Sequence, residues 1–369
     1  MKLADGQARW YRLRRSGLVE RYDTPERVAS VLVGVQAQIL PAAGLSLWNR
    51  APGLTHARFD GLLHEERTLV KLWGQRGTLH LYPSAEWPLV YSARSEQLTW
   101  WERSLEARGG SVERHNALIT AIEGMLRERG TMGRSDLRTA DLEMEDWHFS
   151  SWGGIFADLV RRGYACHAPQ AGGEGRFAHR EHWLPGLPWD PPAPDEANAE
   201  LTRRYLHAYG PATVHDFAYW RGVKVSAARR WLAALGDEVT AVEVEDQPML
   251  ALRDDLPALA EAPPEREAWP VRMLYRFDPL LLAHKDKGWL VEPHNYARVW
   301  RAAGHIEGNL LEHGRIVATW RYDRKPSGLT ITLSPFVPLP AYLRAAVERI
   351  APTIATFFGL PLVGLQIAD

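Results

Sequence analysis

Residues 28–40 read V-A-S-V-L-V-G-V-Q-A-Q-I-L and are followed by Pro41. Almost every side chain in this stretch is apolar, which predicts a buried helix with a fixed place in a core. Two glutamines, Gln36 and Gln38, interrupt the apolar character near its end. Because burying an amide without a partner costs roughly 1–3 kcal/mol, the two glutamines need a structural or a functional explanation.

The proline limits how the two glutamines can be arranged. In an ideal helix, residues two apart point about 200° away from each other, so Gln36 and Gln38 would not share a site. Pro41 disfavours the helical conformation at Leu40, and we therefore expect the last turn to open at Gln36–Gln38. An opened turn can present both amides to one cleft. The alternative is that the amides satisfy carbonyls at the helix end or face solvent.

Several other segments follow the Q-A-Q sequence in a distinctive order. Directly after it comes P-A-A-G-L-S-L-W-N-R, and the later segments are R-G-T-L-H (Arg76–His80), Y-L-H-A-Y-G-P-A-T (Tyr205–Thr213), D-F-A-Y-W (Asp216–Trp220), F-D-P-L-L (Phe277–Leu281) and H-G-R-I-V-A-T-W (His313–Trp320). With these segments the chain resembles the bacterial AlkZ-type DNA glycosylases, which belong with the YcaQ-type proteins to a family of tandem winged helices. The resemblance extends over essentially the whole chain.

The resemblance implies an activity and a place for the two glutamines in it. AlkZ-type enzymes cut the bond between deoxyribose and a guanine alkylated at N7, a base that departs as a neutral molecule and needs no general acid. An amide can hold a water or face the developing positive charge on the sugar. We hypothesise that Gln38 positions the water and that Gln36 supports it electrostatically, although the two roles could be exchanged. The family's tolerance of interstrand crosslinks implies an open channel instead of a closed base pocket.

Composition excludes several classes of protein. The chain has 369 residues, 46% of them hydrophobic and 24% charged, which is ordinary for a globular protein. Its one cysteine, Cys166, allows neither an intramolecular disulfide nor a cysteine-based zinc site. The histidines are scattered, so we expect no metal site and no cofactor. The N-terminus lacks the apolar core of a signal peptide, and no apolar run is long enough to span a membrane, so we expect a cytoplasmic protein without membrane association.

The charge is unevenly distributed along the chain. The net charge is −1, but residues 1–110 carry 15 Lys and Arg against 11 Asp and Glu, and residues 271–369 carry 12 against 8. The two middle segments, 111–190 and 191–270, are acidic, with 9 against 12 and 8 against 14. We therefore expect double-stranded DNA carrying alkylated guanine to contact the first and last quarters of the chain.

The order of predicted elements indicates an α+β protein. Helices followed by hairpins recur three times, which predicts three tandem winged-helix units plus a small C-terminal β-barrel-like module around a DNA-binding channel. The expected boundaries are 1–110 for the first winged helix with the catalytic motif, 111–190 for the second, 191–265 for the third, and 266–369 for a β-rich module with a C-terminal helix. Proline-rich stretches at 185–194 and 262–270 mark two linkers.

Local signals predict the individual elements. Thr24 has the chemistry of an N-cap for the apolar helix. We expect a hairpin from 69–73 and 78–82 with a turn at Gln75-Arg76-Gly77, and a second from 164–167 and 176–184. In the last module, the runs 271–282, 290–293, 305–313, 315–322 and 329–333 read as strands, and 340–357 reads as a helix.

Six cationic or potentially cationic side chains are candidates for contact with DNA: Arg76, His80, Lys285, Lys287, His313 and Arg315. The first two lie on the expected first wing, the lysines in the A-H-K-D-K turn, and the last two at the tip of a late hairpin. Each could equally be a solvated charge, and Arg76 could hold its own hairpin. Many relatives have an acidic residue before the hairpin glycine where this chain has His313.

Two functions remain open from the sequence. The first is a monofunctional DNA glycosylase that removes N7-alkylguanine, including bulky adducts or crosslinks, in repair or in self-resistance to a genotoxic natural product. The second is a non-catalytic winged-helix DNA-binding regulator or a genotoxin-sequestering protein. The paired glutamines favour the enzyme, because a regulator has no need of them. Three unlike units in tandem predict a monomer.

Overall fold

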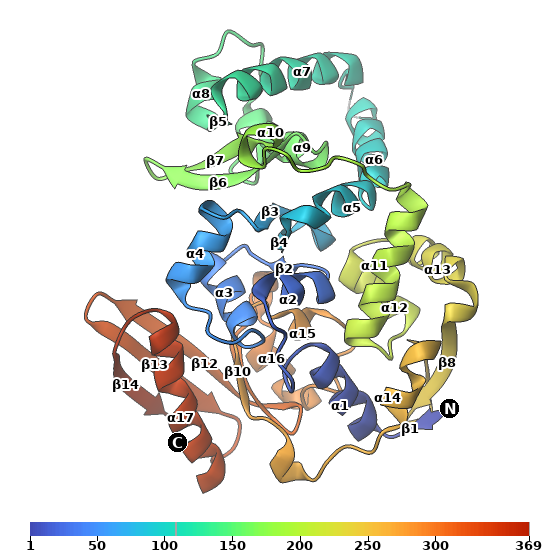
Figure 1. The fold of residues 1–369 in the computed structure, drawn as a ribbon, viewed down its shortest axis with the longest axis vertical. Coiled ribbons are helices and arrows are strands. Elements are labelled where there is room, and N and C mark those ends of the chain that lie inside the picture. The colour runs from blue at the N-terminus through green and yellow to red at the C-terminus, as the bar shows by residue number, and fades with distance from the viewer. Residues whose placement is uncertain (108, 369) are drawn as a thin grey trace. The chain divides into compact units, whose positions relative to one another are not determined.

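The computed structural model describes residues 1–107 and 109–368 of the chain, and they form a mixed α+β fold (Figure 1). The chain divides into two compact units. The first comprises Met1–Phe59 together with Thr202–Asp369, and the second comprises Asp60–Leu201. No helix in the described ranges combines the length and apolar character needed to cross a membrane.

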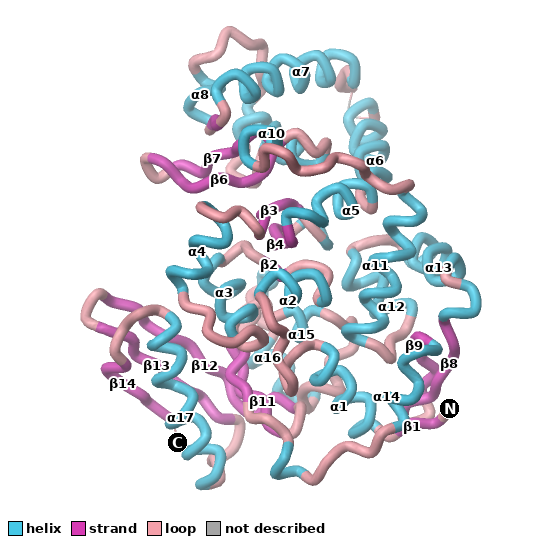
Figure 2. Tube along the Cα trace, in the orientation of Figure 1, coloured by secondary structure: helices cyan, strands magenta, loops and turns pink. Residues whose placement is uncertain are grey.

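The first unit contains most of the helices (Figure 2). Their bounds are α1 (Asp5–Arg15), α2 (Pro25–Val31), α3 (Leu40–Trp48), α12 (Val214–Arg221), α13 (Val225–Ala234), α14 (Leu256–Ala260), α15 (Pro279–Leu282), α16 (Tyr296–Val299) and α17 (Ala341–Phe357), with α4 (His56–His64) and α11 (Pro194–Tyr209) spanning the unit boundaries. As expected, Thr24 caps α2, its side chain accepting a hydrogen bond from the Arg27 backbone N–H at 3.1 Å.

Five strands of the first unit form one sheet in the order β10-β11-β12-β13-β14. Their bounds are β10 (Arg272–Leu274), β11 (Gly308–Glu312), β12 (Arg315–Lys325), β13 (Gly328–Pro335) and β14 (Leu362–Ile367). Neighbours pair antiparallel except β13 and β14, which are parallel. Because β10 and β14 are both edge strands, the sheet is open, so the β-barrel-like module expected from the sequence is not a closed barrel. Helix α17 packs against β13 and β14 (Figure 1).

A smaller sheet of the first unit joins the N-terminus to a later hairpin. Strand β1 (Lys2–Leu3) pairs parallel with β8 (Val239–Val244), and β8 pairs antiparallel with β9 (Gln247–Leu252). The hairpin follows α13 directly in the chain, as the sequence predicts.

The second unit is built around two hairpins and a shared apolar core. Strands β3 (Leu69–Trp73) and β4 (Leu79–Pro83) pair antiparallel, as do β6 (Ala165–Ala171) and β7 (Glu174–His179), with β5 (Thr131–Met132) beside β7. The helices are α5 (Trp87–Ser92), α6 (Ser95–Glu106), α7 (Val112–Arg129), α8 (Arg134–Arg138), α9 (Gly154–Arg161) and α10 (Arg180–Trp183). Buried Val70, Leu72, Ile122, Phe156 and Phe177 belong to this core.

Two strand predictions for the last module are wrong. Most of 271–282 is not a strand, because β10 ends at Leu274 and Asp278 caps the short helix α15, its carboxylate accepting from the Leu280 N–H at 3.0 Å. The run 290–293 forms no strand, and β14 was not predicted. Short apolar runs with proline do not separate strands from helix starts.

Candidate catalytic motif

The apolar stretch is not one helix. Helix α2 ends at Val31, and the backbone N–H groups of Val33 and Gly34 donate to the carbonyls of Ser30 and Ala29 at 3.1 and 2.7 Å. This bonding pattern is that of a Schellman motif. Val33 has φ 55° and Gly34 has φ 92°, so the chain turns through the left-handed region before the glutamines. The predicted helix from Val28 to Leu40 is therefore wrong over its second half.

The segment after the turn is extended and leads into a new helix. Val35 and Gln36 form the short strand β2, and α3 begins at Leu40. Pro41 is the second residue of α3, where its missing N–H costs nothing, so it helps to begin a helix instead of ending one. The predicted break at P-A-A-G is wrong for the same reason, because these residues form the first turn of α3.

The extended backbone brings the two glutamine side chains together. The Nε2 atom of Gln36 donates a hydrogen bond to Oε1 of Gln38, with the atoms 2.6 Å apart. Gln36 is 6% exposed, whereas Gln38 is exposed to solvent. The expectation that the two amides meet is confirmed, although the chain achieves this with an extended segment and not with an opened helical turn.

Two side chains from α11 hold the end of α2. The hydroxyl of Tyr209 donates to the carbonyl of Leu32 at 2.9 Å, directly before the left-handed turn, and Tyr209 is fully buried. Arg204 donates to the Ser30 hydroxyl at 3.3 Å. These contacts explain why the segment Tyr205–Thr213 accompanies the glutamine motif in the sequence: it fixes the backbone from which the glutamines extend.

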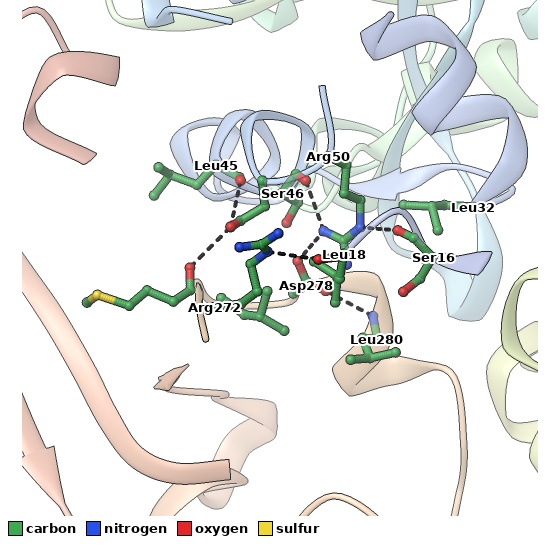
Figure 3. A network of polar contacts seen from close by, with 12 residues as sticks. Ser16, Leu18, Leu32, Leu45, Ser46, Arg50, Arg272, Asp278 and Leu280 are labelled. Atoms are coloured by element: carbon green, nitrogen blue, oxygen red, sulfur yellow. Dashed lines mark hydrogen bonds and ion pairs between the residues drawn. The ribbon is translucent and has the colours of Figure 1, made fainter. Parts of the chain in front are cut away.

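A buried ion pair fixes the other side of the motif. Arg50, which follows α3, donates from Nη1 and Nη2 to the two carboxylate oxygens of Asp278 at 2.7 Å each (Figure 3). Its Nε and Nη1 also donate to the carbonyls of Ser16 and Ser46 at 2.7 and 2.9 Å. The F-D-P-L-L segment therefore has a structural role, because Asp278 links α15 to the C-terminal end of α3, the helix that follows the two glutamines.

The two candidates on the first hairpin are differently exposed. Arg76 lies at the tip between β3 and β4 with φ 55°, and its side chain is partly exposed. His80 is only 4% exposed, and its Nδ1 lies 3.0 Å from the Thr78 carbonyl. Its ring also lies against Tyr82, with the ring centroids 6.0 Å apart. Arg76 is thus available to a polyanion, whereas His80 supports the hairpin.

The two lysines of the A-H-K-D-K turn are also placed differently. The Lys285 side chain is exposed, and its backbone N–H donates to Asp216 at 2.8 Å. Lys287 is 4% exposed, and its Nζ donates to the carbonyls of Leu281 and His284. A phosphate can reach the first ammonium group but not the second without a rearrangement of the turn.

The two candidates beside the late turn make contacts within the protein. The ring of His313 lies 4.2 Å from that of Trp269, and its carbonyl accepts a hydrogen bond from Arg9 at 2.8 Å. Burial, together with Arg9 and other nearby arginines, lowers the pKa of His313, which leaves it uncharged at neutral pH. Arg315 forms ion pairs with Glu292 at 3.0 Å and Asp5 at 3.5 Å.

A second and longer hairpin is formed by β12 and β13, whose strands the sequence predicts over 315–322 and 329–333 but which continue beyond these ranges. Strands β12 and β13 pair from Ala318 with Pro335 to Lys325 with Gly328, so this hairpin turns at 325–328. Exposed Arg321, Arg324 and Lys325 lie near its tip. The alternation of apolar and charged residues in W-R-Y-D-R-K was the signal for a strand that continues beyond Tyr322.

Comparisons with known proteins identify the family of this chain. The sequence model of the AlkZ-like DNA glycosylases matches residues 29–357. The chain belongs to the AlkZ-like DNA glycosylase family. It is 29% identical over 380 residues to the interstrand DNA cross-link repair glycosylase of Streptomyces sahachiroi, with both chains covered completely.

The solved structure of Streptomyces sahachiroi DNA glycosylase AlkZ superposes with a TM-score of 0.85 at 28% identity, again over 100% of both chains. Membership of the AlkZ-like family and this match over the full length make the chain a DNA glycosylase. They also confirm the family resemblance that the six sequence segments indicate.

Proposed function

We propose that this chain is a monofunctional glycosylase that hydrolyses the N-glycosidic bond of N7-alkylguanine in double-stranded DNA, with Gln36 and Gln38 as its catalytic residues. The observation that carries the proposal is the 2.6 Å hydrogen bond between their amides, with one partner buried and the other exposed. This contact leaves one amide fixed to the protein and the other directed to solvent.

The number of hydrogen bonds that an amide can make assigns a different role to each glutamine. An amide oxygen has two acceptor sites, and the NH₂ group has two donors. Oε1 of Gln38 uses one site to accept from Gln36, so its second site is free to accept from an attacking water. Gln36, held by the surrounding protein, is the positioning partner that fixes the Gln38 carbonyl. The water adds to C1′ as the sugar–base bond breaks, its proton passes to solvent, and the alkylated guanine leaves as a neutral molecule.

Exposure of Gln38 suits a substrate with a bulky base. A residue at the bottom of a closed pocket would require the damaged base to be enclosed, which a crosslinked base cannot be. The crosslink activity in the name of the Streptomyces relative supports the extension of the proposal to interstrand crosslinks and bulky adducts. A role in repair or in self-resistance to a genotoxic natural product follows from that substrate.

We further propose that helices and hairpins in each of the two units contact DNA. Hairpins β3–β4, β6–β7 and β8–β9 each follow helices in the chain, in agreement with winged-helix units at 1–110, 111–190 and 191–265 before a β-rich module at 266–369. Partly exposed Arg76 and exposed Lys285 are the cations from the predicted set that are best placed to contact phosphate, and the β12–β13 tip adds Arg324 and Lys325. The protein acts as a monomer.

The experiment compares single-turnover release of N7-methylguanine from duplex DNA by the wild type, Gln36→Ala, Gln38→Ala and Gln247→Ala. Removing one preorganised polar group costs on the order of 10²-fold in rate, so we expect a loss of this size for Gln38→Ala and a smaller loss for Gln36→Ala. Gln247 is an exposed glutamine of β9 and serves as the matched control. If both motif variants release the base at the wild-type rate, the catalytic assignment is wrong.

A second substrate tests the extension to crosslinks. The same proteins are incubated with a duplex that carries an N7-guanine interstrand crosslink, and strand separation is followed on a denaturing gel. The proposal is supported if the protein releases the crosslinked base and if the rates of the variants fall in the same order as on the N7-methylguanine duplex. Release of methylguanine alone restricts the enzyme to small lesions.

A further inference from the structure

A cavity of about 1010 Å³ lies within the first unit. Neither Gln36 nor Gln38 is among the residues that line it. It is formed by α1, the start of α12, the β8–β9 hairpin and the turn at 284–289. Its walls are mostly apolar, with Val214, Ala241, Met249 and Leu250 among them. A largely apolar cavity with a few polar groups is typical of a small-molecule site.

Three side chains in contact with each other supply one polar wall of this cavity: Arg12, His284 and Trp289. The Arg12 guanidinium lies 4.5 Å from the centroid of the Trp289 ring, and the His284 and Trp289 ring centroids are 5.2 Å apart. Arg12 is 1% and His284 is 2% exposed. The wall therefore consists of two buried nitrogen-bearing side chains against a partly exposed tryptophan ring.

Two nitrogens of this wall lack hydrogen-bond partners. Nε of Arg12 and Nε1 of Trp289 are buried and reach no acceptor. Arg12 otherwise donates from Nη2 to the Pro211 carbonyl at 2.6 Å. Each unsatisfied buried polar group costs about 1–3 kcal/mol, so the wall favours a molecule that brings hydrogen-bond acceptors. Trp289 is partly exposed and lines the cavity together with Arg12.

The charges in the wall define the kind of acceptor. Burial lowers the pKa of Arg12 to about 10, so it is still a cation at neutral pH. Burial and the nearby Arg12 lower the pKa of His284 well below its usual value, although the Tyr209 backbone accepts a hydrogen bond from its ring. The carboxylate of Asp216 already accepts from Thr213 and from the Lys285 N–H, at 2.7 to 2.9 Å. The lining also contains the carboxylates of Asp5, Glu245 and Asp286 and the cations Lys285 and Arg315, so the negatively charged group of a ligand would bind beside Arg12.

We propose that this cavity binds an amphipathic small molecule with a flat apolar body and one carboxylate or comparable oxygen acceptor. The apolar body packs against the side chains of Val214, Met249 and Leu250. The oxygens accept hydrogen bonds from Arg12 and Trp289. The proposal does not depend on the glycosylase mechanism, because neither glutamine lines the cavity.

The test is calorimetric titration of the full chain with 2-naphthoate, and with 2-methylnaphthalene as the same body without the acceptor. We expect one naphthoate per chain and at least tenfold weaker binding of methylnaphthalene. Ala241→Trp fills the cavity from an exposed position of β8 and should abolish binding. The matched control is Ala234→Trp, an exposed alanine on α13 outside the cavity lining, which should bind as the wild type does.

A further variant separates the donors from the apolar walls. Trp289→Phe keeps the aromatic ring and removes the N–H, so it should reduce the preference for naphthoate over methylnaphthalene severalfold. Circular dichroism confirms that each variant is folded. The proposal is overturned if naphthoate shows no saturable binding. Equal binding by Ala241→Trp and Ala234→Trp would also overturn it.

Discussion

Arg50 and Asp278 meet through two nitrogen–oxygen contacts of 2.7 Å, and neither side chain is exposed to solvent. The pair joins the end of the helix that follows the glutamines to the cap of α15, more than two hundred residues later in the chain. Removing one partner from a buried pair leaves a charge without compensation, which typically costs about 3–5 kcal/mol.

We therefore predict that Asp278→Ala lowers the free energy of unfolding by about 3–5 kcal/mol, measured by urea denaturation. Asp323→Ala is the matched control. It removes a carboxylate from an exposed ion pair with Lys325 at 3.0 Å, for which we expect a change below about 1 kcal/mol. Equal losses for the two variants would show that the buried pair contributes no more than a surface pair.

Sequence reasoning predicted elements with a strong local signal. The Thr24 cap, the β3–β4 hairpin and the last long helix have clear capping, turn and periodicity signals, and the structure contains each of them. The left-handed turn at Val33 was not predictable, because a β-branched residue rarely adopts positive φ. Bonds to Ser30 and Ala29 and the contact from Tyr209 to Leu32 select that turn, and the last of these depends on tertiary structure.

Some features of the candidate site were likewise predictable from the sequence, and others were not. The sequence singled out both glutamines, since two polar residues in an apolar run are conspicuous, and their side chains do meet in the structure. It could not separate Lys285 from Lys287 or place His313 against Trp269. Burial of a charged side chain depends on which elements pack around it, and no local pattern encodes that.

The contact between Tyr209 and Leu32 predicts an effect on catalysis without direct contact with DNA. Tyr209→Phe removes the hydroxyl that holds the Leu32 carbonyl at 2.9 Å, four residues before Gln36. We expect a loss of about 1 kcal/mol in stability and a severalfold lower rate of base release, measured under single-turnover conditions.

Tyr205→Phe is the control for this prediction. The buried Tyr205 hydroxyl donates to the Ala283 carbonyl, also at 2.9 Å, so the chemical change is the same. We expect a similar loss of stability with an unchanged rate of release. Parallel changes in rate for the two variants would mean that the Leu32 contact has no special part in positioning the glutamines.

Lys71 in β3 predicts a dependence of stability on pH. Burial lowers the pKa of Lys71 from 10.5 to about 8. Between these two values the unfolded chain binds more protons than the folded chain, so this residue makes stability rise as the pH rises from about 8 to 10.5. Below pH 8 the folded protein carries the full cost of a buried ammonium group, which is about 3 kcal/mol for a shift of this size.

We predict that Lys71→Met stabilises the protein at pH 7 and that its advantage shrinks toward pH 10. The measurement is urea denaturation of both proteins across this range. Lys224→Met, at an exposed position before α13, should change stability by less than about 0.5 kcal/mol. An advantage of Lys71→Met that stays constant with pH would indicate improved apolar packing and not the removal of a buried charge.

Lys285 and Lys287 form a natural pair for testing DNA contact, because they are two residues apart and only Lys285 is exposed. Lys285→Ala keeps the backbone bond to Asp216 and removes one exposed charge. If Lys285 contacts a phosphate, the slope of log K against log salt should fall in magnitude by about 0.9, with stability unchanged. The slope is measured by fluorescence anisotropy of a labelled duplex.

Lys287→Ala should instead leave the slope unchanged and destabilise the protein, because two buried carbonyls lose their donor. An unchanged slope for Lys285→Ala would remove Lys285 from the DNA-binding surface and leave Arg76 and the β12–β13 tip as its candidates.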